Sequence, residues 1–157
     1  MSEHHARVNW SAGAAGFRRG RFSRAHRWTF DGGLEIPASA SPAVIPAPWS
    51  DPAAVDPEEA FVAALASCHM MSFLFLANRA GHEVSHYDDE ASGTLAADAD
   101  GRQAITSVIL RPRVRFVSGH GPDDDELDLL HEQAHRTCYI ANSVRTTIHL
   151  EPRAADD

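Results

Sequence analysis

The chain has little cysteine and little positive charge, and both shortages limit the classes of protein to which it can belong. Its 157 residues include only two cysteines, Cys68 and Cys138. Lysine and arginine together number 14, against 22 aspartate and glutamate residues, which gives a formal net charge of −8. A surplus of negative charge repels phosphate backbones and anionic lipid head groups. We therefore expect neither nucleic acid nor a membrane surface as a partner.

Targeting and membrane-spanning signals are also lacking. The first thirty residues contain no apolar stretch with a basic flank and a small-residue cleavage site, so nothing indicates secretion. The longest apolar stretch, 60–77, is interrupted by Ser67, His69 and Ser72 and is shorter than the roughly 20 residues that span a bilayer. We expect a cytoplasmic protein. In a reducing cytosol, a disulfide between the two cysteines is transient and chemical rather than a permanent structural link.

The order of the expected elements predicts an α+β fold. Period-two alternation, turn residues and β-branched side chains indicate strands on both sides of a long central helix, with a second helix near the C-terminus. The expected strands are 6–11, 17–30, 34–37, 84–95, 105–117 and 143–150. Six prolines between 37 and 57 predict an irregular loop, and Pro112 marks a bulge or an edge. The length favours a single domain over 1–157, with disordered tails at 1–5 and 153–157.

Two helices have clear start or stop signals. Asp56 and Glu59 form a capping-box pattern around Pro57, and Gly81 closes the first helix. The apolar residues of this helix fall on every face, which is typical of a central helix between other layers. The second helix follows the run G-P-D-D-D, and its apolar stripe recurs at spacings of three and four. That stripe consists of Leu127, Leu130, His131, Ala134 and Cys138.

Cys68 lies in the almost wholly apolar first helix, where the simplest interpretation is a buried small hydrophobe. Its polar neighbours Ser67 and His69, and the position of Cys138 on the apolar stripe of its own helix, favour a thiol redox centre instead. A thiol becomes nucleophilic when a cation stabilises its thiolate. His69 follows Cys68 directly, and adjacent helical residues point about 100° apart, so we do not expect His69 to act on the thiol.

Three segments resemble one known family. The segment D-P-E-E-A-F-V-A-A-L-A-S-C-H-M, with Glu58 ten residues before Cys68, resembles the signature of the OsmC/Ohr family of osmotically inducible and organic hydroperoxide resistance proteins. The segment A-H-R-T-C-Y-I-A-N-S-V around Cys138 resembles the second-cysteine segment of that family, and F-S-R-A-H-R-W-T-F-D-G-G with A-S-A-S-P resembles the N-terminal arm of its OsmC-like branch. Tyr139 stands where the organic hydroperoxide branch often has proline, which leaves substrate preference and electron donor open.

The resemblance implies an OsmC-like fold and a thiol-dependent peroxidase for organic, and also inorganic, hydroperoxides. Cys68 would be the peroxidatic cysteine, Cys138 the resolving cysteine and Glu58 the catalytic glutamate. Arg24 fits the family's arginine, because it opens an R-x-x-R pattern before D-G. The alternatives for that arginine are Arg18, Arg19 and Arg21. The resemblance implies no cofactor, and it implies an external dithiol reductant of the lipoyl type or another type.

Helix geometry adds an expectation that does not depend on the family. On one straight helix, Glu58 and Cys68 lie roughly 15 Å apart along the axis, which is too far for contact. We therefore expect an intertwined homodimer, in which Glu58 and Arg24 of one chain approach the thiol of the other. A bend near Pro57 would instead let Glu58 act within its own chain. Arg24 would stabilise the thiolate and orient the peroxide, and Glu58 would hold the guanidinium through a bidentate pair.

Two other functional classes stay open. His131, Glu132 and His135 match H-E-x-x-H, a helical pattern that can bind zinc with the glutamate as general base. A zinc-dependent hydrolase would need a third ligand, for which His149 or Glu151 is available. The simpler interpretation is a chance match with solvated or capping histidines. A non-catalytic redox sensor or binding protein could use the same two cysteines without turnover.

Overall fold

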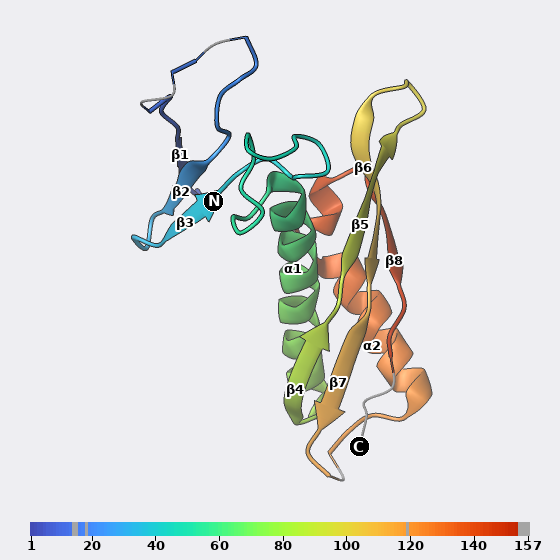
Figure 1. The fold of residues 1–157 in the computed structure, drawn as a ribbon. Coiled ribbons are helices and arrows are strands. Elements are labelled where there is room, and N and C mark those ends of the chain that lie inside the picture. Colours follow the sequence, from blue (N-terminus) through green and yellow to red (C-terminus); the bar gives the residue numbers. More distant parts are fainter. Residues whose placement is uncertain (14–15, 18, 119, 154–157) are drawn as a thin grey trace. The chain divides into compact units, whose positions relative to one another are not determined.

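The computed structural model describes residues 1–13, 16–17, 19–118 and 120–153. Arg18 and the tail residues 154–157 therefore lie outside the described residues. The chain forms two compact units, Met1–Ala60 and Phe61–Asp157, and the single domain over 1–157 stays a prediction. Figure 1 shows the elements, which confirm the α+β class: β1 (Ala6–Asn9), β2 (His26–Phe30), β3 (Glu35–Ala38), α1 (Pro57–Ala80), β4 (Val84–Asp89), β5 (Ser92–Ala97), β6 (Gln103–Leu110), β7 (Pro112–Phe116), α2 (Asp124–Thr137), the 3-10 helix η1 (Ala141–Ser143) and β8 (Thr147–Leu150).

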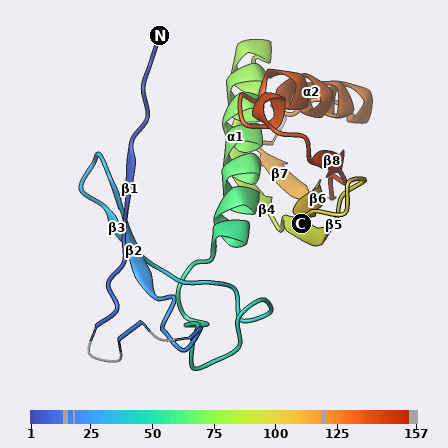
Figure 2. The same ribbon diagram turned by 90° about the horizontal axis from the view of Figure 1, so that it is seen from above.

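The first unit contains the antiparallel sheet β1–β2–β3, which is visible in Figure 2. The central strand β2 pairs on both sides, because Trp28 lies opposite Val8 of β1 and Ile36 of β3. The D-G-G turn joins β2 to β3, as expected. Strand β3 includes Pro37, so the irregular loop starts after Ala38 rather than at the first proline.

Both ends of α1 have the expected capping hydrogen bonds. The Glu59 backbone N–H donates to Asp56 Oδ1 at 2.7 Å, and the Asp56 backbone N–H donates to Glu59 Oε2 at 3.1 Å. At the C-terminus, Gly81 has a φ of +90°, a left-handed conformation that glycine adopts without steric cost. Its N–H donates to the Asn78 carbonyl at 3.1 Å, and the N–H of the next residue, His82, donates back to the helix at 3.0 Å. This is the Schellman arrangement.

Within the second unit, α1 is covered on one face only. The residues that it buries are Leu65, Cys68, His69, Phe73 and Ala77. Met71 and Phe75 are 58% and 60% exposed, so the second unit by itself does not form the expected sandwich between layers. At 24 residues the helix is longer than the apolar stretch 60–77, and its length and composition alone would suit a membrane span. That is weak evidence for a membrane span, because the core helix of a soluble protein can have the same length and composition.

The two long strands expected at 84–95 and 105–117 are each divided in two. Strand β4 pairs with β7, whereas β5 pairs with β6, and β8 adds to β6 in parallel. The division has a physical cause at residues 111 and 112. The Arg111 backbone N–H donates to Asp89 Oδ1 at 2.7 Å instead of to a neighbouring strand, and Pro112 has no N–H to donate. The prediction of two continuous strands was therefore wrong.

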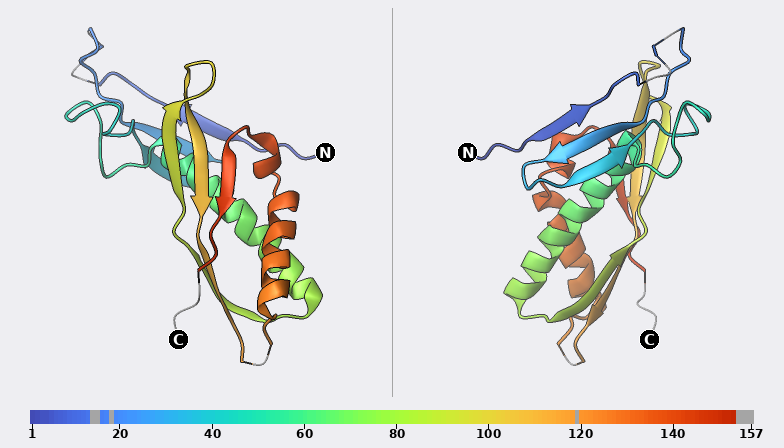
Figure 3. Two further views of the ribbon diagram at one scale, coloured as in Figure 1. Left: turned by 90° about the vertical axis from the view of Figure 1, so that its right-hand side faces the viewer. Right: turned by 60° about the vertical axis from the view of Figure 1, so that its left-hand side comes forward.

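The core of the second unit joins the two helices to the strands. Phe73 and Ala77 of α1 pack with Val114 of β7 and with Leu130 and Ala134 of α2. Closer to the N-terminus of α1, Leu65 packs against Val108 and Leu110 of β6. Figure 3 shows α1 and α2 beside each other against the strands of this unit. The buried faces of α1 and α2 therefore meet, and these are the faces that carry the two cysteines.

Helix α2 confirms the second predicted helix. Asp123 caps it by accepting the Glu126 backbone N–H at 2.9 Å. The helix ends at Thr137, and Cys138 is its C-cap residue rather than a member of the last turn. The chain then forms η1 before β8 starts at Thr147, so the last strand begins later than Ser143.

Candidate active site

The two cysteines, 70 positions apart in the sequence, come together where the C-terminus of α2 meets α1. Both are free thiols, and they are buried, with exposed fractions of 8% for Cys68 and 1% for Cys138. The Cys138 thiol lies close enough to Cys68 for Cys68 to raise its pKa. Its sulfur also accepts the Ala141 backbone N–H at 3.4 Å. The expectation that both thiols lie on helix faces that pack together therefore agrees with the structure.

The environment makes the two thiols unequal. Burial raises the pKa of Cys138 to about 11, and the nearby Cys68 acts in the same direction. The Ala141 backbone N–H opposes this rise only in part. Cys138 is therefore a protonated thiol at neutral pH and is a poor nucleophile in the reduced chain. Of the two sulfurs, Cys68 is the one that is free to act first.

A buried pair of histidines lies next to the thiols along the same helices. His69 Nε2 and His131 Nδ1 are 3.2 Å apart, and the rings are almost parallel, at 5°. Their centroids are 5.5 Å apart, so the rings lie end to end rather than face to face, as an N–H···N hydrogen bond requires. His131 also packs on the Phe73 ring, with 4.4 Å between centroids. The pair therefore joins α1 to α2 through the core.

This pair does not support the zinc alternative. His131 is 2% exposed and His69 is 1% exposed, so the expectation of solvated or capping histidines was wrong for His131. The Nδ1 atom of His131 already bonds to His69. Among the described residues, no three histidine, cysteine, aspartate or glutamate side chains are arranged to hold a metal ion. Burial is the largest cause that lowers the pKa of both imidazoles to about 4, so both are neutral at pH 7.

Arg24 is held within the first unit by its own neighbours. Its Nη1 donates to the Gly20 carbonyl at 2.9 Å and to the Phe22 carbonyl at 2.6 Å. The guanidinium also lies over the Phe22 ring, 3.8 Å from its centroid, where a cation is attracted to the ring face. Arg24 is half-buried, whereas the alternatives Arg19 and Arg21 are exposed.

The single chain does not form the expected pair between Arg24 and Glu58. Within the part of the chain that the structure describes, no ion pair joins them, and Glu58 Oε2 is buried without a hydrogen bond. Helix α1 runs from Pro57 to Ala80 without interruption, so the ten residues between Glu58 and Cys68 span roughly 15 Å. Whether Glu58 and Arg24 serve Cys68 of their own chain or of a partner therefore stays a prediction.

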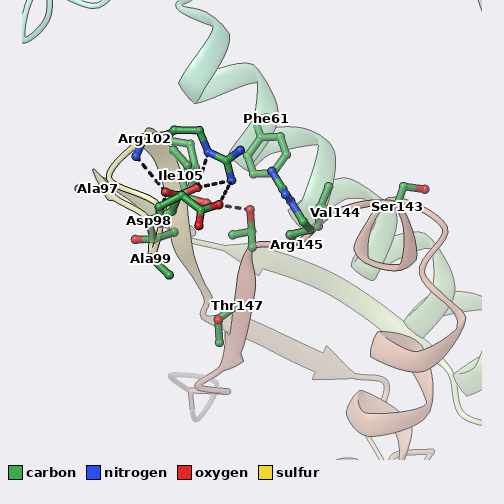
Figure 4. Close-up of a pocket in the computed structure, with 14 residues that line it drawn as sticks. Phe61, Ala97, Asp98, Ala99, Arg102, Ile105, Ser143, Val144, Arg145 and Thr147 are labelled. Atoms are coloured by element: carbon green, nitrogen blue, oxygen red, sulfur yellow. Dashed lines mark hydrogen bonds and ion pairs between the residues drawn. The ribbon is translucent and has the colours of Figure 1, made fainter.

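A separate cleft of about 870 Å³ lies in the second unit, between the tip of the β5–β6 hairpin and residues 143–147. Figure 4 shows Arg102 reaching Asp98 through two hydrogen bonds, at 3.1 and 3.0 Å. The Arg102 backbone N–H and guanidinium, with Arg145 nearby, hold the pKa of Asp98 below its usual value. The cleft also contains Asp100, so its positive and negative side chains balance. No cysteine lines it, and sequence reasoning did not identify it.

The fold and the cysteine pair can be compared with known proteins. Residues 50–153 match the family described as OsmC-like protein. An OsmC-like protein of unknown function from Vibrio cholerae is 47% identical and superimposes with a TM-score of 0.95, over 98% of this chain and 100% of that chain. No curated protein matches the chain.

More distant solved structures share the fold alone. The organic hydroperoxide resistance protein OsmC from Legionella pneumophila has a TM-score of 0.70 at 17% identity, over 99% of this chain and 98% of that chain. The organic hydroperoxide resistance protein OhrB of Bacillus subtilis has a TM-score of 0.65 at 19% identity, with 98% of both chains covered.

Proposed function

The chain belongs to the OsmC-like protein family, and from this premise we propose that it is a cysteine-based peroxidase that reduces organic hydroperoxides. The observation that carries the proposal is the contact between the two free, buried thiols of Cys68 and Cys138. Two solved proteins of the same fold are named organic hydroperoxide resistance proteins. The proposed setting is the cytoplasm, where reductants keep such thiols ready to react.

The first chemical step belongs to Cys68. Its thiolate attacks one oxygen of the hydroperoxide, the O–O bond breaks, and the second oxygen leaves as an alcohol after taking up a proton. The sulfur is oxidised by two electrons and becomes a sulfenic acid. The role falls to Cys68 because burial keeps Cys138 protonated, with a pKa of about 11.

The second step closes a disulfide. The Cys138 sulfur attacks the sulfenic sulfur, an S–S bond forms, and the sulfenic hydroxyl leaves as water with the proton from Cys138. The two thiols are already close enough to interact in the reduced chain, so the partners of this step are near each other before oxidation. An external dithiol, of the lipoyl type or another type, then reduces the disulfide and is itself oxidised to a disulfide.

Arg24 and Glu58 have supporting roles in this proposal. Arg24 stabilises the Cys68 thiolate and orients the peroxide, and Glu58 holds the guanidinium. The buried, unpartnered oxygen of Glu58 supports the need for a cation that the single chain does not place beside it. A homodimer would bring Arg24 and Glu58 of one chain to the Cys68 thiol of the other and would cover the exposed side of α1.

The experiment is steady-state consumption of an organic hydroperoxide with a lipoyl dithiol, a thioredoxin-type donor or glutathione as reductant. We expect turnover with a dithiol, none in Cys68→Ser, and a single oxidation per chain in the matched variant Cys138→Ser. Retained turnover in Cys68→Ser would refute the proposal. A chain that is oxidised once but never turns over with any donor would be a redox sensor, and loss of activity with a chelator would indicate a zinc enzyme.

A further inference from the structure

We infer that His26 is a positioning residue for Arg24, and this inference rests on the proposed peroxidase function. His26 holds the main chain of Arg24 against the sheet β1–β2–β3 through a proton on Nδ1. The evidence is a chain of two hydrogen bonds that runs from Trp28 through the His26 ring to the carbonyl of Arg24.

The direction of these hydrogen bonds fixes the tautomer of His26. The Trp28 indole Nε1 can only donate, and it lies 2.8 Å from His26 Nε2. Nε2 must therefore be the unprotonated nitrogen, and the proton of the neutral ring must be on Nδ1. The Nδ1–H then donates to the Arg24 carbonyl at 2.7 Å. Both hydrogen bonds exist together only in the neutral ring with its proton on Nδ1.

The sheet makes this connection stiff. His26 and Trp28 are two positions apart on β2, so their side chains lie on the same face. Strand β2 pairs on both sides, with Trp28 opposite Val8 and Ile36. The segment just before the strand, which carries Arg24, is therefore tied to the most strongly paired part of the first unit.

The backbone N–H and the backbone carbonyl of Arg24 both form hydrogen bonds. Its N–H donates to the Trp49 carbonyl at 2.9 Å, and its carbonyl accepts from His26. With the backbone fixed, Nη1 bonds to two nearby carbonyls and the guanidinium lies over Phe22. Among the described residues, Nε and Nη2 of Arg24 have no partner, which leaves them available for a peroxide or a carboxylate. Arg24 lines a largely apolar cavity of about 320 Å³ together with Trp10 and Phe22.

The hydrogen bond from Trp28 determines which ring nitrogen of His26 carries the proton. Because the indole N–H donates to Nε2, Nδ1 keeps its proton and is the donor to the Arg24 carbonyl. A side chain without a donor at this position would release the Arg24 carbonyl, and we expect it to slow the oxidation of Cys68.

The test uses three variants in a Cys138→Ser background, where Cys68 oxidation stops at the sulfenic acid and can be trapped. His26→Leu removes the donor and should slow oxidation by an organic hydroperoxide at least about tenfold. His26→Asn is the matched control, because its amide N–H stands near the position of Nδ1 and can donate to the Arg24 carbonyl. We expect His26→Asn to keep most of the rate. Trp28→Phe removes the hydrogen bond that holds the proton on Nδ1 and should slow oxidation, but less than His26→Leu does.

Combining His26→Leu with Arg24→Ala distinguishes a positioning role of His26 from a general effect on stability. If His26 acts through Arg24, His26→Leu should have no further effect once Arg24→Ala is present. Independent, multiplying effects of the two substitutions would overturn the inference, as would an unchanged rate in Arg24→Ala or a loss of rate in His26→Asn as large as that in His26→Leu. Peroxide consumption that survives Cys68→Ser would instead mean that the proposed peroxidase function itself has failed. Thermal melting of each variant checks that it is folded.

Discussion

The buried imidazoles of His69 and His131 should make the folded chain less stable in mild acid. Burial is the largest cause that lowers the pKa of each from 6.5 to about 4, and the charges of His131 and His135 lower that of His69 further. In the unfolded chain the same groups titrate near 6.5. Below that pH the unfolded state binds protons more readily than the folded state. The stability that the neutral pair contributes is therefore complete above pH 6.5 and is lost as the pH falls toward about 4.

The magnitude follows from the difference between the two pKa values. A fall from 6.5 to about 4 corresponds to about 3 kcal/mol for one imidazole. The two nitrogens are 3.2 Å apart, so a proton on one ring opposes a proton on the other and enlarges the loss, whereas the charge of Asp128 favours protonation of His131 and reduces it. We therefore expect a loss of at least about 3 kcal/mol from the pair. For a domain of ordinary stability this is a large share of the free energy of unfolding.

The assay is urea denaturation at about pH 7 and about pH 4.5, at one protein concentration, because association would also contribute to stability. The matched control is the double variant His69→Gln and His131→Asn, which places amide groups near the two bonded ring nitrogens and cannot titrate. Its free energy of unfolding should fall by at least about 3 kcal/mol less than that of the native chain over the same interval. An equal fall in both proteins would refute the reasoning.

Three further predictions concern the fold and its assembly. Sedimentation of the native chain at micromolar concentration should show a dimer, because Met71 and Phe75 are exposed on α1 within one chain; a folded monomer would contradict this. Asp56→Ala removes the capping hydrogen bond to Glu59 and should lower the free energy of unfolding in urea by about 1 kcal/mol, so an unchanged midpoint would count against that cap. Gly93→Ala would place its Cβ 2.7 Å from Val62 Cγ2 and should cost about 1–3 kcal/mol in stability. A melting temperature equal to that of the native chain would mean that α1 and β5 lie farther apart.

The parts of the fold that were predicted correctly depend on residues close together in the sequence. The ends of α1 are set by Asp56, Glu59 and Gly81, whose hydrogen bonds span only a few positions. The division of the two long strands could not be predicted in this way. It depends on Asp89 accepting the backbone N–H of Arg111, 22 positions away, and no local pattern indicates such a contact.

The site was predictable in part. The two cysteines lie on apolar stripes, so their approach in the core followed from helix periodicity. His69 and His131 lie on the same two stripes, and a buried polar side chain on each of two packed helices needs a partner, which is the signal that could have identified their pairing. The expected pair of Arg24 and Glu58 is absent from the described part of the chain, where the Arg24 guanidinium instead donates to the carbonyls of Gly20 and Phe22.

The most direct test of the proposed peroxidase is a single-turnover titration of the reduced chain with an organic hydroperoxide, followed by mass spectrometry of non-reduced peptides. One equivalent of hydroperoxide per chain should remove both thiols, release one equivalent of alcohol and join Cys68 to Cys138 within the same chain. A bridge between chains, or Cys68 over-oxidised while Cys138 remains a free thiol, would contradict the two-cysteine cycle.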